Sequence, residues 1–163
     1  MNGTSKKEKM TIIMFSGELD KVLAGFTLAN TAASMGMDVY MFFTFWGINI
    51  IRKNISKNRS KRFAQKMFGV LNKGGVDRLP LSKFHMLGIG TSMMKRLMQK
   101  TKVDSINEMI ELAKSLGVKF MACTMSMEIM GITAENLISE VDGICGAAAY
   151  LAEAKKSSIN LFI

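Results

Sequence analysis

The sequence predicts an α/β protein whose mostly parallel sheet is covered by helices on both faces. Two observations support this fold class. Short apolar runs of strand length alternate along the chain with longer stretches that have helical periodicity. Such alternation is typical of parallel sheets, whose right-handed connections place helices over the sheet. With 163 residues, 48% of them apolar, we expect residues 1–163 to form one domain with a substantial core.

Five segments have the length and composition of buried strands, and each lies next to glycine or polar turn residues. They are Met10–Phe15, Val39–Phe43, Val118–Cys123, Val141–Ile144 and Ile159–Ile163. Helical stretches without proline separate them. We expect helices at Glu18–Met35, at Asp104–Leu116 with Asp104 as N-cap, at Ser126–Met130, from about Thr133, and at Gly146–Lys155.

One segment, at about 48–103, interrupts this alternation and is too long for a simple loop. We interpret it as a basic helical insertion after the second strand. Within it we expect a basic helix at Arg59–Leu71, a turn at Gly88–Gly90, and a last helix capped by Thr91 or Ser92. The pattern at Gly88–Gly90 is not a dinucleotide-binding loop, because no strand precedes it and no third glycine follows.

The positive charge of the chain is concentrated in this insertion. The formal net charge is +9, but residues 52–102 hold fourteen of the 22 basic residues and one acidic residue, Asp77. The insertion therefore carries +13 and the rest of the chain −4. A basic run can bind nucleic acid, but few aromatic residues accompany it and no nucleic-acid motif is present. A solvated basic face is the simpler interpretation, and we do not expect nucleic-acid binding.

The location of the protein follows from what the sequence lacks. No apolar run approaches the ~18 residues that a membrane-spanning helix needs, and the polar N-terminus has no signal-peptide pattern. Two cysteines are too few for a disulfide scaffold. We therefore expect a cytoplasmic protein with reduced thiols.

Candidate functional residues follow the predicted strands, because ligands of parallel sheets gather at the carboxyl ends of strands. Three such places are Ser16–Gly17, Thr44–Gly47 and Cys123–Thr124. Ser16 could hold an anion at a helix start, but Glu18 brings negative charge there, and a simple N-cap is the better interpretation.

Cys123 is the sharpest candidate, since it ends a predicted buried strand just before a turn into a helix. Backbone N–H groups at such a turn stabilise a thiolate and raise its reactivity. A small buried packing residue is an equally good interpretation of its position. The only histidine, His85, is remote in sequence, so a Cys-His pair is not supported. One histidine and two scattered cysteines indicate no metal site, and no cofactor motif is present.

Cys145 is a second thiol, and it could act as a resolving partner of Cys123. The two do not form a CxxC motif, and the sequence leaves open whether they meet. A packing role for Cys145 is the simpler interpretation. The methionines around Cys123 and the second strand also fit core or subunit-interface packing better than a ligand pocket.

Three stretches together carry a resemblance to a known family. They are Phe42–Gly47, Ala122–Glu128 and Val141–Gly143, and Met86–Lys95 resembles the insertion of one branch. The chain resembles the DsrE/DsrF-like superfamily from about Lys9 to Ile163, most of all its stand-alone, so-called peroxiredoxin-like branch.

The resemblance implies a flavodoxin-like three-layer sandwich that assembles into homo-oligomers, commonly trimers or larger. It also implies that Cys123 carries sulfane sulfur as a persulfide, beside TusA-like or rhodanese-like partners. On this basis we expect a sulfur carrier or sulfurtransferase whose pocket is shaped by Thr124, Ser126 and the Thr44-Phe45-Trp46 loop. The basic insertion would attract anionic sulfur donors. The alternative is a non-catalytic module that docks on a membrane surface or a partner protein through its basic, Met-rich insertion.

Overall fold

The computed structural model describes residues 7–54, 74–84 and 86–163. In these ranges the strands are β1 (Lys9–Met14), β2 (Asp38–Phe43), β3 (Lys119–Cys123), β4 (Gly143–Cys145) and β5 (Ile159–Phe162). They form one sheet in the order β4-β3-β2-β1-β5, and every neighbouring pair is parallel. The expected parallel sheet is confirmed, and the five strands lie within one or two residues of the predicted segments.

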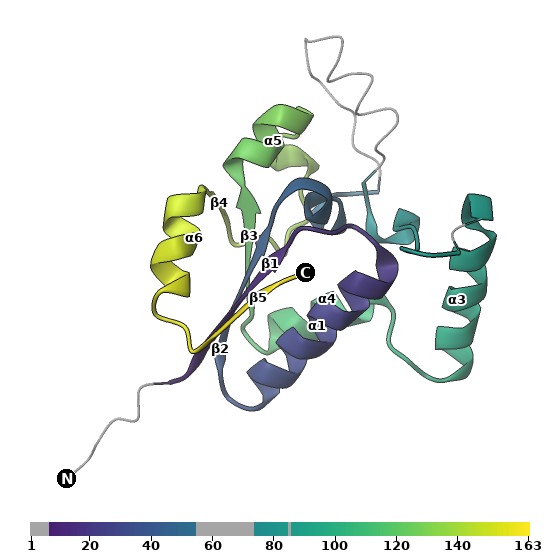
Figure 1. Ribbon diagram of the computed structural model, residues 1–163, viewed down its shortest axis with the longest axis horizontal. Helices are drawn as coiled ribbons and strands as arrows, with labels where there is room; N and C mark the ends of the chain where they lie inside the picture. Colours follow the sequence, from purple (N-terminus) through teal and green to yellow (C-terminus); the bar gives the residue numbers. More distant parts are fainter. Residues whose placement is uncertain (1–6, 55–73, 85) are drawn as a thin grey trace.

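Helices cover both faces of the sheet (Figure 1). They are α1 (Leu19–Ser34), α3 (Ile89–Lys100), α4 (Ile106–Ser115), α5 (Thr124–Met130) and α6 (Ala147–Ala154). Helices α1 and α4 pack together on one face, and α6 lies on the other. Short 3₁₀ helices are η1 (Phe45–Ile51), η2 (Val76–Arg78), η3 (Met86–Gly88) and η4 (Ala134–Asn136). The result is the three-layer α/β sandwich that we expected.

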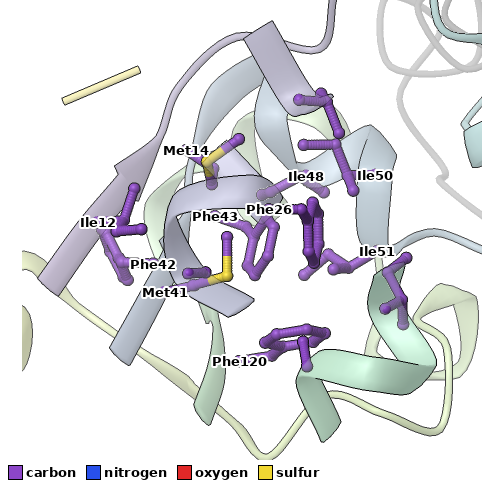
Figure 2. Packing of buried hydrophobic residues seen from close by; sticks show 14 of the residues in the cluster. Ile12, Met14, Phe26, Met41, Phe42, Phe43, Ile48, Ile50, Ile51 and Phe120 are labelled. Atoms are coloured by element: carbon purple, nitrogen blue, oxygen red, sulfur yellow. The ribbon is translucent and has the colours of Figure 1, made fainter. Parts of the chain in front are cut away.

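The core on the α1 side is built around three fully buried aromatic rings (Figure 2). The ring of Phe43 lies 6.4 Å from that of Phe26 and 5.3 Å from that of Phe120. Phe26 and Phe120 meet edge to face at 5.8 Å. Each such pair adds about 0.5–1.5 kcal/mol beyond the burial of its area. These contacts tie α1, β2 and β3 together, and so fix the strand ends that carry the candidate residues.

The segment directly after β2 also belongs to the core. Ile48, Ile50 and Ile51 of η1 are fully buried, and Figure 2 shows Ile48 and Ile50 above the aromatic rings and Ile51 beside them. Gly47 makes this path possible, because a Cβ there would lie 1.9 Å from the carbonyl oxygen of Met14. The first residues of the expected insertion thus pack under the carboxyl ends of the strands.

The start of α1 differs from the prediction. Ser16 is not its N-cap: Glu18 occupies that position without a side-chain cap. The backbone N–H of Leu19 instead donates to the carbonyl of Pro80 at 2.7 Å, and the Asp20 carboxylate accepts from the backbone N–H of Ser82 at 2.9 Å. A distant segment therefore satisfies the helix terminus, which local sequence rules do not foresee.

Two other expectations about helix starts were wrong, and a third was right about the start but not about the length of the helix. Ser105, not Asp104, caps α4, because Ser105 and Glu108 form a reciprocal capping box. Helix α3 starts at Ile89, before Thr91 or Ser92, since Gly88 precedes it in a left-handed conformation. The helix expected from about Thr133 does begin there, with Thr133 as N-cap, but it is only the short 3₁₀ helix η4.

One expectation about the insertion and one about membrane-spanning helices remain. The basic helix expected at Arg59–Leu71 lies outside the described residues. In the part of the chain that the structure describes, no helix has both the length and the apolar composition needed to cross a bilayer.

Asp142 fastens the start of β4 to β3. Its carboxylate accepts hydrogen bonds from the backbone N–H of Phe120 at 2.7 Å and from the ammonium groups of Lys114 at 2.6 Å and Lys119 at 3.2 Å. Partial burial raises the pKa of Asp142, but the hydrogen bonds of Lys114, Phe120 and Lys119 lower it by more, so the pKa lies below its ordinary value. These hydrogen bonds fix the position of β4, and therefore that of Cys145, relative to β3.

We predict that Asp142→Asn lowers the free energy of unfolding by about 1.5–3 kcal/mol, since it weakens charge-assisted hydrogen bonds. The contribution of the carboxylate is present above its unfolded pKa and is lost as the pH falls through the depressed folded pKa. Urea unfolding at neutral pH and at acidic pH measures both effects. Asp104→Asn, at an exposed acidic residue, is the control and should stay within about 0.5 kcal/mol. Equal urea-unfolding midpoints for Asp142→Asn and Asp104→Asn would contradict the stabilising role of the Asp142 carboxylate.

Candidate functional site

The ends of β2 and β3 bring a thiol and two hydroxyl groups together. Cys123 ends β3, and Thr44 directly follows β2, which is the parallel neighbour of β3. Ser126 comes from the first turn of α5 and is fully buried. The hydroxyl oxygens of Thr44 and Ser126 lie 2.9 Å apart. Two residues at strand ends, Thr44 and Cys123, and one from the first turn of α5, Ser126, thus form one polar cluster.

The Ser126 hydroxyl is positioned by the backbone of the neighbouring loop. Its oxygen accepts a hydrogen bond from the backbone N–H of Phe45 at 2.9 Å. A hydroxyl that accepts in this way keeps its own hydrogen for a second partner. That hydrogen can go to the Thr44 hydroxyl oxygen or to the Cys123 sulfur, and hydrogen bonding to Ser126 lowers the pKa of the Cys123 thiol.

The pKa of Cys123 results from two opposing effects. Burial is the largest single effect and raises the pKa, because Cys123 exposes 4% of its surface. The hydroxyl and the backbone N–H of Ser126 lower it. The Thr44 hydroxyl and the backbone N–H of Met125 lower it further. Together the hydrogen bonds outweigh burial, and the pKa of the Cys123 thiol lies below its ordinary value. The thiolate, the nucleophilic form of cysteine, is therefore more accessible at this position than at an unperturbed cysteine.

Phe45 connects this cluster to the end of β1. Its backbone lies in the left-handed region, at φ 45°, which is strained for a residue with a side chain. This conformation turns the N–H of Phe45 toward Ser126, while its ring packs 5.3 Å from that of Phe15. Strain of this kind persists where the surroundings enforce it, and here the hydrogen bond and the ring contact do so.

The other expected residues gather beside the cluster. Ser16, Gly17 and Trp46 line a pocket of about 400 Å³, together with Phe15, Glu18, Lys21, Asn49 and Pro80. Gly17 permits this arrangement, because a Cβ there would lie 2.6 Å from the carbonyl oxygen of Trp46. Thr124 is the half-buried first residue of α5, and the effects that set the pKa of Cys123 come from Ser126, Thr44 and Met125 instead.

Cys145 lies on the strand next to Cys123. In the parallel pairing of β3 with β4, the two cysteines are direct Cα partners. Both are free, Cys123 buried and Cys145 partly exposed. The Cys145 sulfur lies 3.5 Å from the hydroxyl of Tyr40 on β2. The sequence left open whether the cysteines come close, and the register of β4 places their Cα atoms side by side.

The sequence reasoning expected backbone N–H donors at the turn into α5, where Met125 lies, but it did not single out Tyr40 or the backbone N–H of Phe45. No residue type marks the N–H of Phe45 as a donor to Ser126, so only the folded backbone could reveal that contact. Tyr40 could have been noticed by alternation along β2, which places it on the same face as Phe42 and Thr44. Across the described ranges, no three His, Cys, Asp or Glu side chains are grouped to hold a metal ion.

Two solved structures share the fold. One is the protein MTH1491 from Methanobacterium thermoautotrophicum, with a TM-score of 0.54 over 96% of this chain and 100% of that chain. The other is the ychN protein from E. coli, with a TM-score of 0.55 over 96% of this chain and 99% of that chain. Both are 11% identical to this chain, so the likeness concerns the fold alone.

Two relatives are similar in sequence over nearly their whole length. The uncharacterized protein YrkE of Bacillus subtilis (strain 168) is 41% identical over 160 residues, which are 98% of this chain and 99% of the relative. The sulfur carrier protein DsrE2 of Allochromatium vinosum is 34% identical over 162 residues, 97% of this chain and 99% of the relative.

The model of the DsrE/DsrF/DrsH-like family matches residues 6–162, which include the whole sheet and both cysteines. The resemblance seen in the sequence is thereby confirmed. The chain belongs to the DsrE/DsrF/DrsH-like family.

Proposed function

We propose that this protein is a sulfur carrier in which Cys123 accepts sulfane sulfur as a persulfide. The observation that carries the proposal is the environment of the thiol: hydroxyl and backbone N–H donors lower the pKa of Cys123 in spite of its burial. The family and the name of the Allochromatium relative, a sulfur carrier protein, support the same conclusion.

The site suits the chemistry of a persulfide. The Cys123 thiolate attacks a sulfane sulfur in a donor, a new S–S bond forms, and the rest of the donor leaves with the electron pair of the broken bond. The terminal sulfur of the persulfide then carries negative charge, which the same hydroxyl and N–H donors can stabilise. Since Cys123 exposes 4% of its surface, a small anionic donor such as thiosulfate or polysulfide fits better than a bulky one.

A carrier must pass its sulfur on, so the proposal includes partner proteins with an acceptor thiol, of the TusA-like or rhodanese-like kind, in the cytoplasm. It also includes a homo-oligomer. Apolar side chains are exposed on α6 and on the edge strand β5: Leu151 by 62%, Phe162 by 69% and Ile159 by 41%. An exposed apolar surface of this kind is typical of an interface between subunits.

A second candidate function rests on α3. This helix exposes Ile89, Met93 and Leu97, four residues apart and therefore on one stripe. Lys95, Arg96 and Lys100 lie on the same helix, and it has no acidic residue. Figure 1 shows α3 at the periphery, away from the sheet. An apolar stripe flanked by basic residues is typical of helices that lie on anionic membranes.

The sulfur-carrier proposal predicts that polysulfide adds one sulfur, about 32 Da, to the Cys145→Ser variant and none to Cys123→Ser. The matched pair tests position, because each variant keeps one of the chain's two thiols. Intact mass before and after treatment with a reducing dithiol identifies the adduct. Equal uptake by both variants, or none by either, would rule out the proposed role of Cys123.

We also predict that Ser126→Ala raises the pKa of Cys123, because the thiolate loses its hydroxyl donor. In a Cys145→Ser background, the pH dependence of alkylation by a small reagent reports this pKa. The substitution also leaves the N–H of Phe45 without its partner, so stability should fall by about 1–3 kcal/mol. Ser92→Ala, at an exposed serine of α3, should leave the pH profile unchanged. An unchanged profile for Ser126→Ala would contradict the arrangement.

The membrane-docking candidate predicts flotation with vesicles that contain phosphatidylglycerol, weaker flotation at high salt, and none with neutral vesicles. Met93→Glu with Leu97→Glu should abolish it, whereas Leu151→Glu on α6 and Cys123→Ser should not. If the unaltered protein stays with the soluble fraction at low salt, this candidate fails.

A further inference from the structure

The pairing of β3 with β4 places the chain's two cysteines at the same level of the sheet. We propose that Cys145 is a resolving thiol: it closes on the Cys123 persulfide, releases sulfide and leaves an internal Cys123–Cys145 disulfide. This inference rests on the proposed function, since it acts on the persulfide proposed above. It adds a second reacting residue and a second outcome for the bound sulfur.

The spacing of the strands suits a disulfide. Direct partners on adjacent strands lie about 4.8 Å apart, within the range of about 4.4–6.8 Å that Cα atoms of disulfides span. Register partners also project to the same face of a sheet. The pair two residues earlier shows this directly: a Cβ built on Gly143 would lie 2.8 Å from the terminal methyl of its partner Met121.

Cys145 can move a short distance at little cost in free energy. It is the last residue of a three-residue strand at the edge of the sheet, and its side chain is partly exposed. Gly146 follows, with no atom within 4 Å of where its Cβ would be, so the chain there has open space around it. Cys123, by contrast, is held by buried donors. The geometry therefore assigns the moving role to Cys145.

The Tyr40 hydroxyl gives Cys145 a polar partner on the same face. Its oxygen lies 3.5 Å from the Cys145 sulfur, and its ring packs near that of Tyr150 on α6. Burial, and next the contact with Cys145, raise the pKa of Tyr40, so this hydroxyl keeps its proton. It can then donate to a Cys145 thiolate.

The reaction balances without an outside oxidant. The Cys145 thiolate attacks the sulfur atom of Cys123 in the persulfide, and a bond forms between the two cysteine sulfurs. The bond between Cys123 and the outer sulfur breaks, and the outer sulfur leaves as hydrosulfide, which takes a proton to become hydrogen sulfide. The two thiols lose two electrons, and the sulfane sulfur gains them. A cellular dithiol reductant then returns both cysteines to thiols.

Two reactions of the persulfide therefore compete: transfer of its outer sulfur to an acceptor protein, and attack by Cys145. While an acceptor protein is present, the outer sulfur of the persulfide is transferred to it. Without an acceptor, Cys145 closes on Cys123, and the sulfur leaves as sulfide. The carrier would then lose its reactive persulfide. It would instead contain a Cys123–Cys145 disulfide, which must be reduced before the protein can accept sulfur again.

The experiment follows intact mass and released sulfide after a brief exposure to polysulfide and its removal, without an acceptor protein. The unaltered protein should first gain about 32 Da and then become about 2 Da lighter than its reduced form, while releasing about one equivalent of sulfide. A monomer lighter by that mass requires an internal disulfide, because the chain has two cysteines. Cys145→Ser should keep the added sulfur at least about tenfold longer. Cys145→Ala, which has no hydroxyl, should behave in the same way, and circular dichroism confirms that both variants are folded.

Tyr40→Phe separates a positioning role from packing, since it keeps the ring and removes the hydroxyl. It should slow the loss of sulfur without changing the uptake. If sulfur persists equally on the unaltered protein and on both Cys145 variants, the resolving role is overturned and the carrier function stands. If no protein takes up sulfur, the carrier function fails, and the resolving role fails with it.

Discussion

Because all the strands of the described sheet run in one direction, their carboxyl ends lie at a single edge, and the candidate site depends on this constraint. Thr44 and Cys123 meet there because β2 and β3 are neighbours in parallel register. Cys145 joins them because β4 pairs with β3. The buried rings of Phe26, Phe43 and Phe120 hold this register from the α1 side, while the Asp142 carboxylate holds β4 from its start. A slip of one residue would turn every one of these side chains to the opposite face.

Ser126 is the residue through which the site is assembled. It is fully buried, it accepts from the N–H of Phe45, and it contributes a hydroxyl and an N–H to the environment of Cys123. One serine therefore links the loop after β2 to the helix after β3. The strained backbone of Phe45 is compensated by that hydrogen bond and by a ring contact with Phe15. Stabilisation of the thiolate and placement of the loop thus depend on the same buried hydroxyl.

The two cysteines have different surroundings and therefore suit different roles in the proposed chemistry. Cys123 is buried among donors that favour an anion, which suits a group that holds sulfur. Cys145 is partly exposed on a short edge strand beside Tyr40, which suits a group that moves. The exposed apolar side chains of α6, β5 and α3 belong to other elements than the two cysteines.

The sequence by itself determined the fold class and the five strands, and it singled out Cys123 as a candidate, because apolar runs and turn residues report local burial. The rule that sites lie at strand ends added Thr44, and the family resemblance added Ser126. Tertiary structure alone decided the contacts that cross between elements. Pro80, not Ser16, satisfies the start of α1, and the backbone N–H groups of Phe45 and Met125 turn toward the site. The partnership of Cys123 with Cys145 belongs here too, since 22 residues separate them and only strand pairing sets their register. Periodicity indicates which face of an element is buried, but not which distant atom that face meets.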